Sequence, residues 1–436
     1  MSRTHIFAVA GHPVLHSKSP LLFNKSFQKL KEKAVYTRIS TESASEAVTL
    51  FEEIGLSGLN VTAPLKQAII DQLDELEPAA SVIGAVNAVL KERGVLKGSN
   101  TDPLGVTASL KSLGLSLQGR HCVVLGAGGA GKAAAYGLVR EGARVFLVNR
   151  TYRKAVLAAE KLGCDAVYLD ELPSLMNEAN IVVSALAPRI NLIRKEWLHP
   201  AHVVLDANYP HSPLQNLARA QGCTYIPGEA WLLNQAIPAY KLFTGKEADR
   251  AIMERALSFG FGTTTRRNNI SLVGFMGCGK STAGLALAKK LGYSFKDVDA
   301  VIEEREGKTI PEIFHLKGEE RFRSLEKSVL AEIEQERRTV YACGGGAVSD
   351  PENRSTLRSN SRVIWLYAAL GACLQRIDPR SRPLLDKEGR GEKTEELFRK
   401  RLPLYAQAAD LVVSSEKKPE QTAETIYEEI HHTLGD

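Results

Sequence analysis

Short apolar runs alternate with amphipathic segments along the chain, and this alternation predicts a protein of mixed α/β structure. In the first part, buried strands are expected at 5–10, 35–40 and 58–62, with an amphipathic helix at 19–31 between the first two. Such an order of strands and helices is typical of α/β folds, in which helices cover the faces of a sheet.

Residues 121–258 continue the alternation in a longer series, with a helix at 132–140 and two closing helices at 229–244 and 248–258. Strands followed by helices at this spacing predict a Rossmann fold with a parallel sheet. The expected strands are 121–125, 144–148, 181–186, 203–207 and 224–227.

A small, polar and aperiodic stretch then separates this series from another one, and we place a linker there. Apolar runs recur beyond it, at 269–273, 339–343, 362–367 and 411–414, which predicts a second parallel sheet. We therefore expect an α/β domain at 1–102, completed by helices at 229–259, a Rossmann domain at 103–259, a linker at 260–268 and a third domain at 269–436.

Composition narrows the class of protein. The 436 residues are 44% hydrophobic and 24% charged, as in soluble globular proteins. The net charge of +6 is small, aromatic residues make up only 6%, and no basic stripe is present, so we expect no nucleic-acid partner. Six scattered cysteines without zinc spacing, together with the lack of a signal sequence or an apolar run long enough to span a membrane, predict a cytoplasmic protein without a membrane partner.

One glycine-rich loop has the spacing of a dinucleotide fingerprint and lies between an expected strand and an expected helix. The next strand ends in Val148 and is followed by Asn149 and Arg150, where an NAD-binding protein carries an acidic residue, so NADP is favoured over NAD. The alternative is that the nearby cations are only solvated surface charges. The expected cofactor-binding residues are Gly126, Ala127, Gly128, Gly129, Ala130, Gly131, Asn149, Arg150, Thr151, Arg153 and Lys154.

A second glycine-rich loop has the full pattern of a nucleoside-triphosphate P-loop and predicts an ATP site. Lys280 would pair with the phosphates and Ser281 would ligate Mg²⁺. Cys278 within this loop is expected either to be a tolerated small residue or to have a lowered pKa at the helix N-terminus, in which case its oxidation would block ATP. The expected ATP-binding residues are Gly274, Gly277, Cys278, Gly279, Lys280, Ser281 and Thr282.

Residues 1 to about 260 resemble shikimate dehydrogenase, on the motifs Ser17-Lys-Ser19-Pro20, Asn60 to Lys66, Gly84 to Asn87, Asn100-Thr-Asp102 and Asn234-Gln235-Ala236. A lysine beside a carboxylate suits proton transfer to a reduced ketone, and the resemblance assigns this role to Lys66 and Asp102. It further implies that Ser17 and Ser19 bind the substrate carboxylate and that Thr62, Asn87, Gln235 and Tyr209 contact the rest of the substrate. Pro103 and Ala88 depart from the family pattern and affect the expected substrate affinity.

Residues from about 269 onward resemble shikimate kinase, on the P-loop, Asp297-Val-Asp299, Gly318 to Glu326, Gly344-Gly345-Gly346, Arg382 to Leu385 and Arg401 to Tyr405. The resemblance implies that Asp297 organises Mg²⁺ and that Asp299 orients the attacking hydroxyl group. It also implies that Arg323 and Arg401 bind the substrate carboxylate beside Gly344, Gly345 and Gly346. Arg376 would stack on adenine, and a lid at 378–393 would bring Arg382 onto the transferred phosphate.

Together the two resemblances imply a bifunctional enzyme that reduces 3-dehydroshikimate with NADPH and then phosphorylates shikimate with ATP and Mg²⁺. Alternatives are quinate dehydrogenase activity in the first half or gluconate kinase activity in the second. A third alternative is a binding protein in which one half is a catalytically inactive sensor. The presence of Lys66, Asp102, Lys280 and Asp299 disfavours that reading.

Overall fold

The computed structural model describes residues 4–187, 190–209, 212–258, 267–377 and 391–434. The chain separates into two compact units: the first unit comprises 1–20, 27–57 and 259–436, and the second unit comprises 21–26 and 58–258. The units reflect contacts in space, whereas the expected domain boundaries follow the order of the motifs, so those boundaries stay a prediction. Both units contain sheets covered by helices, and the expected α/β class is confirmed.

The larger sheet of the second unit has the order β12-β11-β10-β7-β8-β9, and all its strands are parallel. Chain order reverses between β7 and β10, which makes the carboxyl end of β7 the switch point where a Rossmann fold binds its ligand. The expected Rossmann fold is therefore confirmed. The strands are β7 (His121–Leu125), β8 (Arg144–Val148), β9 (Asp165–Val167), β10 (Ile181–Ser184), β11 (Val203–Asp206) and β12 (Thr224–Ile226).

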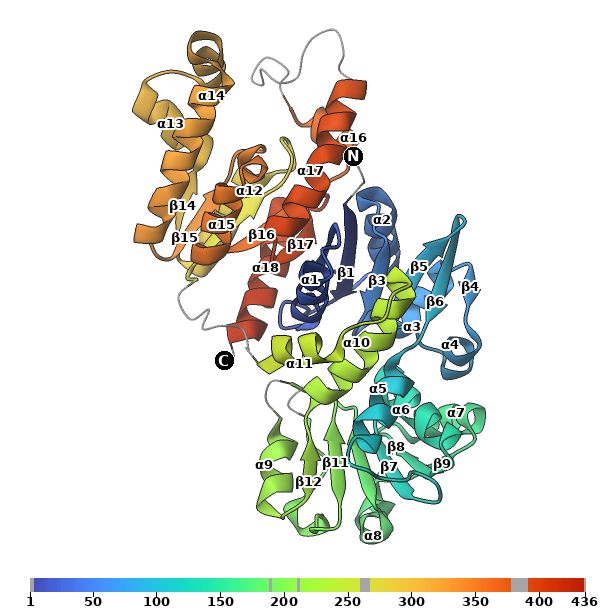
Figure 1. The fold of residues 1–436 in the computed structure, drawn as a ribbon. Helices are drawn as coiled ribbons and strands as arrows, with labels where there is room; N and C mark the ends of the chain where they lie inside the picture. Colours follow the sequence, from blue (N-terminus) through green and yellow to red (C-terminus); the bar gives the residue numbers. More distant parts are fainter. Residues whose placement is uncertain (1–3, 188–189, 210–211, 259–266, 378–390, 435–436) are drawn as a thin grey trace. The chain divides into compact units, whose positions relative to one another are not determined.

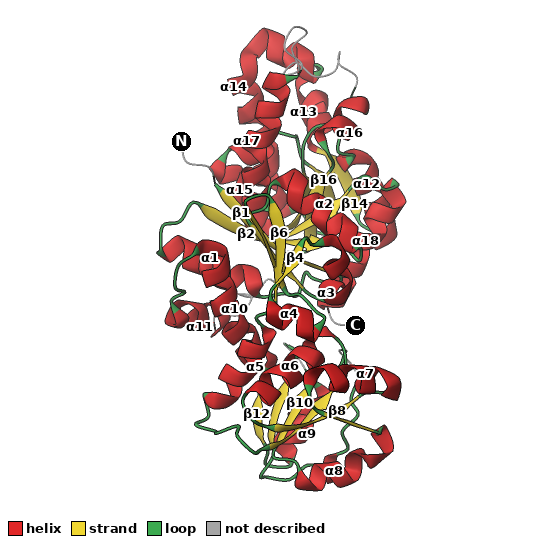
Figure 2. Cartoon of the chain, turned by 90° about the vertical axis from the view of Figure 1, so that its right-hand side faces the viewer, coloured by secondary structure: helices red, strands yellow, loops and turns green. Residues whose placement is uncertain are grey.

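Alternating side chains of β7 divide the core of this sheet into two layers. Cys122 and Val124 pack with helices on one face, and Val123 and Leu125 pack with helices on the other. This alternation follows from the two-residue period of a strand. One face is covered by α5 (Asp102–Lys111), α6 (Gly129–Arg140), α7 (Tyr152–Leu162) and α10 (Gly228–Thr244), and the other by α8 (Leu172–Glu178) and α9 (Pro213–Ala220) (Figure 2).

A smaller group of strands in the second unit has the order β3-β5-β6-β4. β5 and β6 form an antiparallel hairpin through Arg93 and Gly94, which both have positive φ, as a tight two-residue turn requires. The sequence pattern had identified only the first of these strands. The elements are β3 (Gly58–Val61), β4 (Glu75–Leu76), β5 (Ala88–Glu92), β6 (Val95–Ser99), α3 (Leu65–Ala68), α4 (Pro78–Ile83) and α11 (Arg250–Ser258).

The strands of the first unit run in the order β14-β15-β13-β16-β17-β2-β1, and every pairing among them is parallel. The strands lie far apart in the chain, yet β17 pairs with β2 through Val412 opposite Ile39 and Val413 opposite Ser40. Figure 1 labels β17 and β1, the two neighbours of β2 in this order. The pairing of β17 with β2 was not expected from the sequence. The strands are β1 (His5–Gly11), β2 (Ala34–Ser40), β13 (Asn269–Val273), β14 (Ser294–Asp297), β15 (Thr339–Ala342), β16 (Ser361–Tyr367) and β17 (Leu411–Ser414).

Helix ends in the carboxy-terminal segment follow local capping rules. Asp297 and Thr309 accept backbone hydrogen bonds at two helix starts, and Gly318, with φ 75°, interrupts the helix that follows Thr309. Across the part of the chain that the structure describes, no helix combines the length and apolar character needed to cross a bilayer. The remaining helices are α1 (Ser19–Lys29), α2 (Ala44–Ile54), α12 (Lys280–Leu291), α13 (Val298–Glu306), α14 (Ile310–Ala331), α15 (Pro351–Asn360), α16 (Leu370–Gln375), α17 (Glu392–Ala408) and α18 (Pro419–Leu434).

Candidate active sites

The first glycine loop joins β7 to α6 and has no room for side chains at its closest turn. A Cβ atom on Gly131 would lie 1.7 Å from the carbonyl oxygen of Gly126, and Gly126 itself has φ 103°. Asn149, at the end of β8, accepts a hydrogen bond from the Ala127 N–H at 3.2 Å. The loop is thus held open at the N-terminus of α6, where free N–H groups favour a pyrophosphate.

A pocket of about 460 Å³ lies in front of this loop, and several positively charged side chains line it. Lys132 and Lys161 line it in addition to the cations expected from the sequence, and burial, followed by the charge of Lys161, lowers the pKa of Lys132. Lys161 was not among the expected cofactor-binding residues, although it lies two turns after Lys154 on the same face of α7. Of the expected residues, the pocket is lined by Ala127, Gly128, Asn149, Arg150, Thr151 and Lys154, whereas Gly126, Gly129, Ala130, Gly131 and Arg153 are not in its lining.

A buried polar cluster stands beside the loop in the same unit. Lys66, on α3, donates to one oxygen of Asp102 at the start of α5, and Asn87 donates to the other oxygen at 3.0 Å. A Cβ atom on Gly129 would approach the Lys66 Cβ atom to 3.1 Å, so the glycine permits close packing of the cofactor loop against the lysine. Three of the expected features, Lys66, Asp102 and the loop, therefore lie together.

Asn87 organises the rest of this cluster. Its amide donates to the Oε1 atom of Gln235 at 3.2 Å, and its oxygen accepts the backbone N–H of Thr101 at 2.8 Å. Thr101 also donates to Gln235 at 3.1 Å, which makes it a residue of the cluster that the list of expected site residues had missed. Pro103 occupies the first turn of α5, where it leaves Asp102 in place because its missing N–H is not needed there.

The remaining expected substrate residues lie on other segments of the chain. Thr62 follows β3 and is half-buried, as is Tyr209 in the loop after β11. Ser17 and Ser19 belong to the first unit, are buried, and have their hydroxyl oxygens 3.3 Å apart. The Ser17 Oγ atom also accepts the backbone N–H of Ser19 at 3.4 Å, which places it at the start of α1.

The second glycine loop joins β13 to α12 in the first unit. Cβ atoms on Gly274 and Gly277 would lie 2.4 Å and 2.3 Å from backbone oxygens, and both residues have positive φ. Lys280 folds its ammonium group back over the loop and donates to the carbonyl oxygens of Gly274 and Phe275 at 3.0 Å each. The ammonium group thus lies over a loop whose backbone N–H groups can bind phosphate oxygens, as in a P-loop. Thr282 donates to the Gly279 carbonyl at 3.0 Å.

The hydroxyl group of Ser281 donates to the Oδ2 atom of Asp297 at 2.5 Å. The other carboxylate oxygen of Asp297 accepts the N–H of Asp299 at 3.0 Å, so β14 presents Asp297 at the start of α13. A hydroxyl and one carboxylate are the donor set that Mg²⁺ uses when phosphate oxygens and water complete its shell. These two residues therefore fit the ion expected from the sequence.

Cys278 is fully buried, and burial, partly offset by nearby Lys280, raises the pKa of its thiol. The expectation of a lowered pKa at this helix N-terminus was wrong in direction, because loss of solvent outweighs the positive groups nearby. Arg376 donates to the Ser415 carbonyl at 3.2 Å at the end of α16. Arg382 and most of the expected lid, 378–390, lie outside the described residues.

Another pocket lies in the first unit. It is lined by Asp299, Arg323, Arg401 and the three glycines 344–346. The Arg401 side chain is buried, and its Nε and Nη1 atoms have no hydrogen-bond partner among the described residues. A buried guanidinium group with vacant donors is costly unless an anion binds it. This pocket therefore fits a small acid whose carboxylate meets Arg401.

Glu326 is a residue of this pocket that the expected site list lacked. It is fully buried and accepts from the Arg323 Nη1 atom at 2.8 Å, and burial raises the pKa of its carboxyl group although Arg323 opposes the change. A Cβ atom on Gly344 would lie 2.3 Å from the Glu326 Oε1 atom, and one on Gly346 would lie 2.4 Å from the Arg323 Nη2 atom. The glycines thus leave room for these two side chains. The sequence does contain a signal for Glu326: it lies three residues after Arg323 on an expected helix, a spacing at which two side chains are neighbours.

The amino-terminal part of the chain matches two family models: the shikimate dehydrogenase substrate-binding domain at 9–89 and the shikimate / quinate 5-dehydrogenase model at 108–210. It is 37% identical over 266 residues to a shikimate dehydrogenase (NADP⁺) of Aquifex aeolicus, covering 59% of this chain and 97% of that protein. The chain belongs to the shikimate dehydrogenase family.

Structures of this family agree with the match. The crystal structure of the Aquifex aeolicus shikimate dehydrogenase has a TM-score of 0.56 at 34% identity, over 59% of this chain and 99% of that one. The Thermus thermophilus shikimate 5-dehydrogenase in complex with NADP(H) and shikimate has a TM-score of 0.53 at 35% identity, over 58% of this chain and 98% of that one. Residues 276–431 match the shikimate kinase family model. The chain thus joins a shikimate dehydrogenase to a shikimate kinase domain.

Proposed function

We propose that this shikimate dehydrogenase with its kinase domain catalyses two consecutive reactions: reduction of 3-dehydroshikimate to shikimate, and phosphorylation of shikimate to shikimate 3-phosphate. NADPH supplies the hydride in the first reaction and ATP supplies the phosphoryl group in the second. The hydrogen-bonded pair of Lys66 and Asp102 beside the dinucleotide loop carries this proposal.

In the dehydrogenase, Lys66 delivers the proton to the oxygen of the new alcohol. Asp102 orients the ammonium group by accepting its hydrogen bond, and Asn87 donates to the second oxygen of Asp102. Thr62, Asn87, Gln235 and Tyr209 bind the hydroxyl groups, while Ser17 and Ser19 donate to the carboxylate. Arg150 and Lys154, with Arg153 nearby, favour NADPH because they pair with a 2′-phosphate.

In the kinase, Asp299 orients the attacking hydroxyl of shikimate and accepts its proton. Arg401 and Arg323 bind the carboxylate, and the vacant buried donors of Arg401 support this role. Lys280 neutralises phosphate charge, Ser281 and Asp297 hold Mg²⁺, Arg376 stacks on adenine, and Arg382 contacts the transferred phosphate. Phosphoryl transfer depends mainly on such positioning and charge neutralisation.

The cytoplasm is the proposed location, supported by six cysteines that all remain unpaired.

To test this proposal, the purified full chain is given 3-dehydroshikimate, NADPH and magnesium-ATP. NADPH oxidation and ADP release are then measured in the same sample. We expect ADP release to begin after NADPH oxidation, because shikimate must form first. Omission of NADPH should abolish both signals, and added shikimate should restore ADP release alone. Faster turnover of quinate by the dehydrogenase or of gluconate by the kinase would contradict the assignment.

A further inference from the structure

The loop between β1 and α1 determines where the hydroxyl groups of Ser17 and Ser19 lie. It turns at Val14, whose carbonyl oxygen accepts the backbone N–H of Ser17 at 2.9 Å. Val14 is fully buried, and both serines are nearly so. The loop is anchored in the first unit, because Val14, Leu15 and both serines are buried there.

A carboxylate from the last helix of the kinase segment holds this loop. Glu429, on α18, is fully buried and accepts the backbone N–H of Val14 at 3.0 and 2.9 Å and that of Leu15 at 2.8 Å. Its Oε1 atom also accepts the hydroxyl group of Ser40, the last residue of β2, at 2.6 Å. Three donors of the dehydrogenase segment therefore converge on one side chain more than 380 residues away in sequence.

A second connection reaches Ser17 itself. Arg38, on β2, donates its Nε and Nη2 atoms to the Ser17 carbonyl at 3.0 and 2.6 Å. Its Nη1 atom donates to the backbone carbonyl of Asp410, just before β17, at 3.0 Å. The pairing of β2 with β17 thus anchors Arg38 between the loop and the kinase segment.

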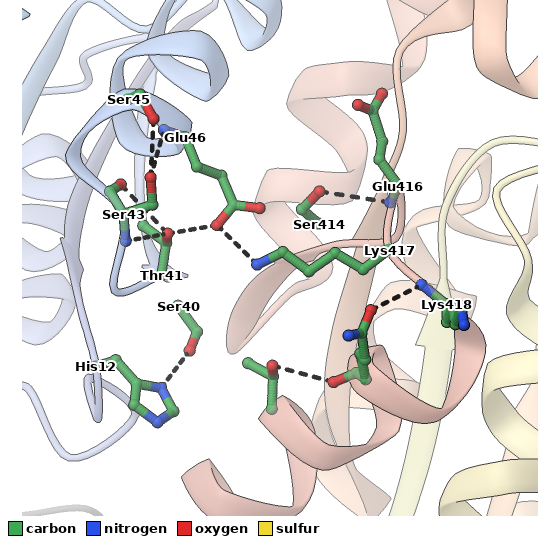
Figure 3. A network of polar contacts seen from close by, with 12 residues as sticks. His12, Ser40, Thr41, Ser43, Ser45, Glu46, Ser414, Glu416, Lys417 and Lys418 are labelled. Atoms are coloured by element: carbon green, nitrogen blue, oxygen red, sulfur yellow. Dashed lines mark hydrogen bonds and ion pairs between the residues drawn. The ribbon is translucent and has the colours of Figure 1, made fainter.

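Near these contacts lies a further polar network, drawn in Figure 3, in which Ser40 and Thr41 are buried and Lys417 is exposed. Lys417 forms an ion pair with Glu46 at 3.2 Å, and Glu46 accepts the hydroxyl group of Thr41 at 2.5 Å. His12 contacts Ser40 at 3.0 Å. The Lys417 end of this ion pair is exposed, and solvent-exposed ion pairs contribute little to stability, so the buried Glu429 is the stronger connection.

The hydrogen bonds around Glu429 favour the ionised form of its carboxyl group despite burial. Burial alone would raise the pKa of Glu429, but hydrogen bonds from His12, Ser40, Leu15 and Val14 together hold it below its ordinary value. A buried charge is tolerated only when its oxygens are satisfied in this way. Conversely, loss of the carboxylate would leave the N–H groups of Val14 and Leu15 buried without an acceptor.

We propose that Glu429 is a positioning residue for the dehydrogenase reaction: from the kinase segment, it sets the path of residues 12–19 so that Ser17 and Ser19 meet the carboxylate of the substrate. This inference rests on the proposed role of the two serines. The kinase segment would then tune substrate affinity in the neighbouring enzyme, without contributing to hydride transfer.

The test is the Glu429→Gln variant of the full chain, which keeps the size of the side chain but turns an amide donor toward backbone donors. Because the serines bind the substrate equally before and during reaction, KM for shikimate in the dehydrogenase assay should rise about tenfold with kcat nearly unchanged. KM for NADP⁺ and both kinase parameters should stay as in the wild type. Glu429→Asp, which keeps the charge, should show a smaller rise.

Glu424→Gln on the same helix is the matched control, because Glu424 pairs with Lys290 and not with the loop. Its dehydrogenase KM should equal that of the wild type. A wild-type KM in Glu429→Gln would overturn the inference alone. A parallel fall of both activities with a lowered melting temperature would show a merely structural role and overturn it as well. A wild-type chain without dehydrogenase activity would instead refute the proposed function.

Discussion

Asn87 donates its side-chain amide to the Oδ1 atom of Asp102 at 3.0 Å, on the carboxylate that also accepts the ammonium group of Lys66. The same amide also donates to Thr101 and to Gln235, so Asn87 connects the proposed proton-transfer pair to Gln235, which is proposed to bind a substrate hydroxyl group. The arrangement orients Asp102 on both sides.

Replacement of Lys66 separates the two reactions. Lys66→Ala removes the proposed proton donor, and we expect the dehydrogenase kcat to fall by about two to four orders of magnitude, the usual contribution of general acid catalysis. Phosphorylation of added shikimate should be unchanged, because the kinase residues lie in the first unit. Steady-state assays of both reactions on one preparation measure this. Lys111→Ala, which removes a surface lysine paired with Glu141, should affect neither reaction, and full reductase activity in Lys66→Ala would refute the assignment.

We expect the preference for NADPH over NADH to depend on the positively charged side chains in front of the dinucleotide loop. Loss of one charged hydrogen bond costs about 1.5–3 kcal/mol, so Lys154→Ala should raise KM for NADPH at least about tenfold while KM for NADH changes little. Initial rates with each cofactor give both constants. Arg140→Ala, at the far end of α6 and outside the pocket lining, is the control. An equal change for NADPH and NADH would contradict a phosphate contact.

Arg401 and Arg399 provide a matched pair in the kinase. Arg401 is buried and its Nε and Nη1 atoms have no hydrogen-bond partner in the part of the chain that the structure describes, whereas the Arg399 side chain is 74% exposed and pairs with Glu395. Arg401→Leu should raise KM for shikimate about a hundredfold, since a charged contact in a dry pocket is worth about 3 kcal/mol, and KM for ATP should change far less. Arg399→Leu should leave both constants unchanged. If Arg401→Leu instead raised only KM for ATP, Arg401 would contact ATP and not shikimate, and the prediction would be wrong.

Thiol reagents should modify the native protein slowly at neutral pH. Burial raises the pKa of all six cysteines, including Cys278 beside the P-loop and Cys164, whose pKa is raised to about 11. A raised pKa keeps the thiol protonated at pH 7, and the thiolate is the nucleophile. Iodoacetamide should therefore leave kinase activity intact, and reaction should accelerate only as the pH becomes alkaline.

Intact-mass measurement checks this prediction, with denatured protein as the control that exposes every thiol. Cys278→Ala should retain wild-type kinase activity, because a small side chain is all that the site needs. Rapid labelling of native protein that stops ATP turnover in the wild type but not in Cys278→Ala would contradict the prediction.

Much of the chemistry could be predicted because it is local in sequence. Gly274, Gly277 and Gly279 all have positive φ, a conformation that glycine adopts readily, so this loop could be recognised from its own residues. Lys161 and Glu326 were missed because their importance depends on helix faces that point into a pocket, which periodicity alone does not distinguish from solvent. The sign of the Cys278 shift was missed because burial is a property of the folded chain.

The sequence by itself determined the α/β class, the two phosphate loops and the residues suited to reduction and phosphoryl transfer, because glycine conformations and spacings act over a few neighbouring residues. Only the tertiary structure decided that β17 pairs with β2 and that Glu429 accepts hydrogen bonds from Val14, Leu15 and Ser40. An edge strand can pair with any strand that offers a matching row of donors and acceptors. Which strand it meets, and which carboxylate is buried there, depends on the packing of segments hundreds of residues apart.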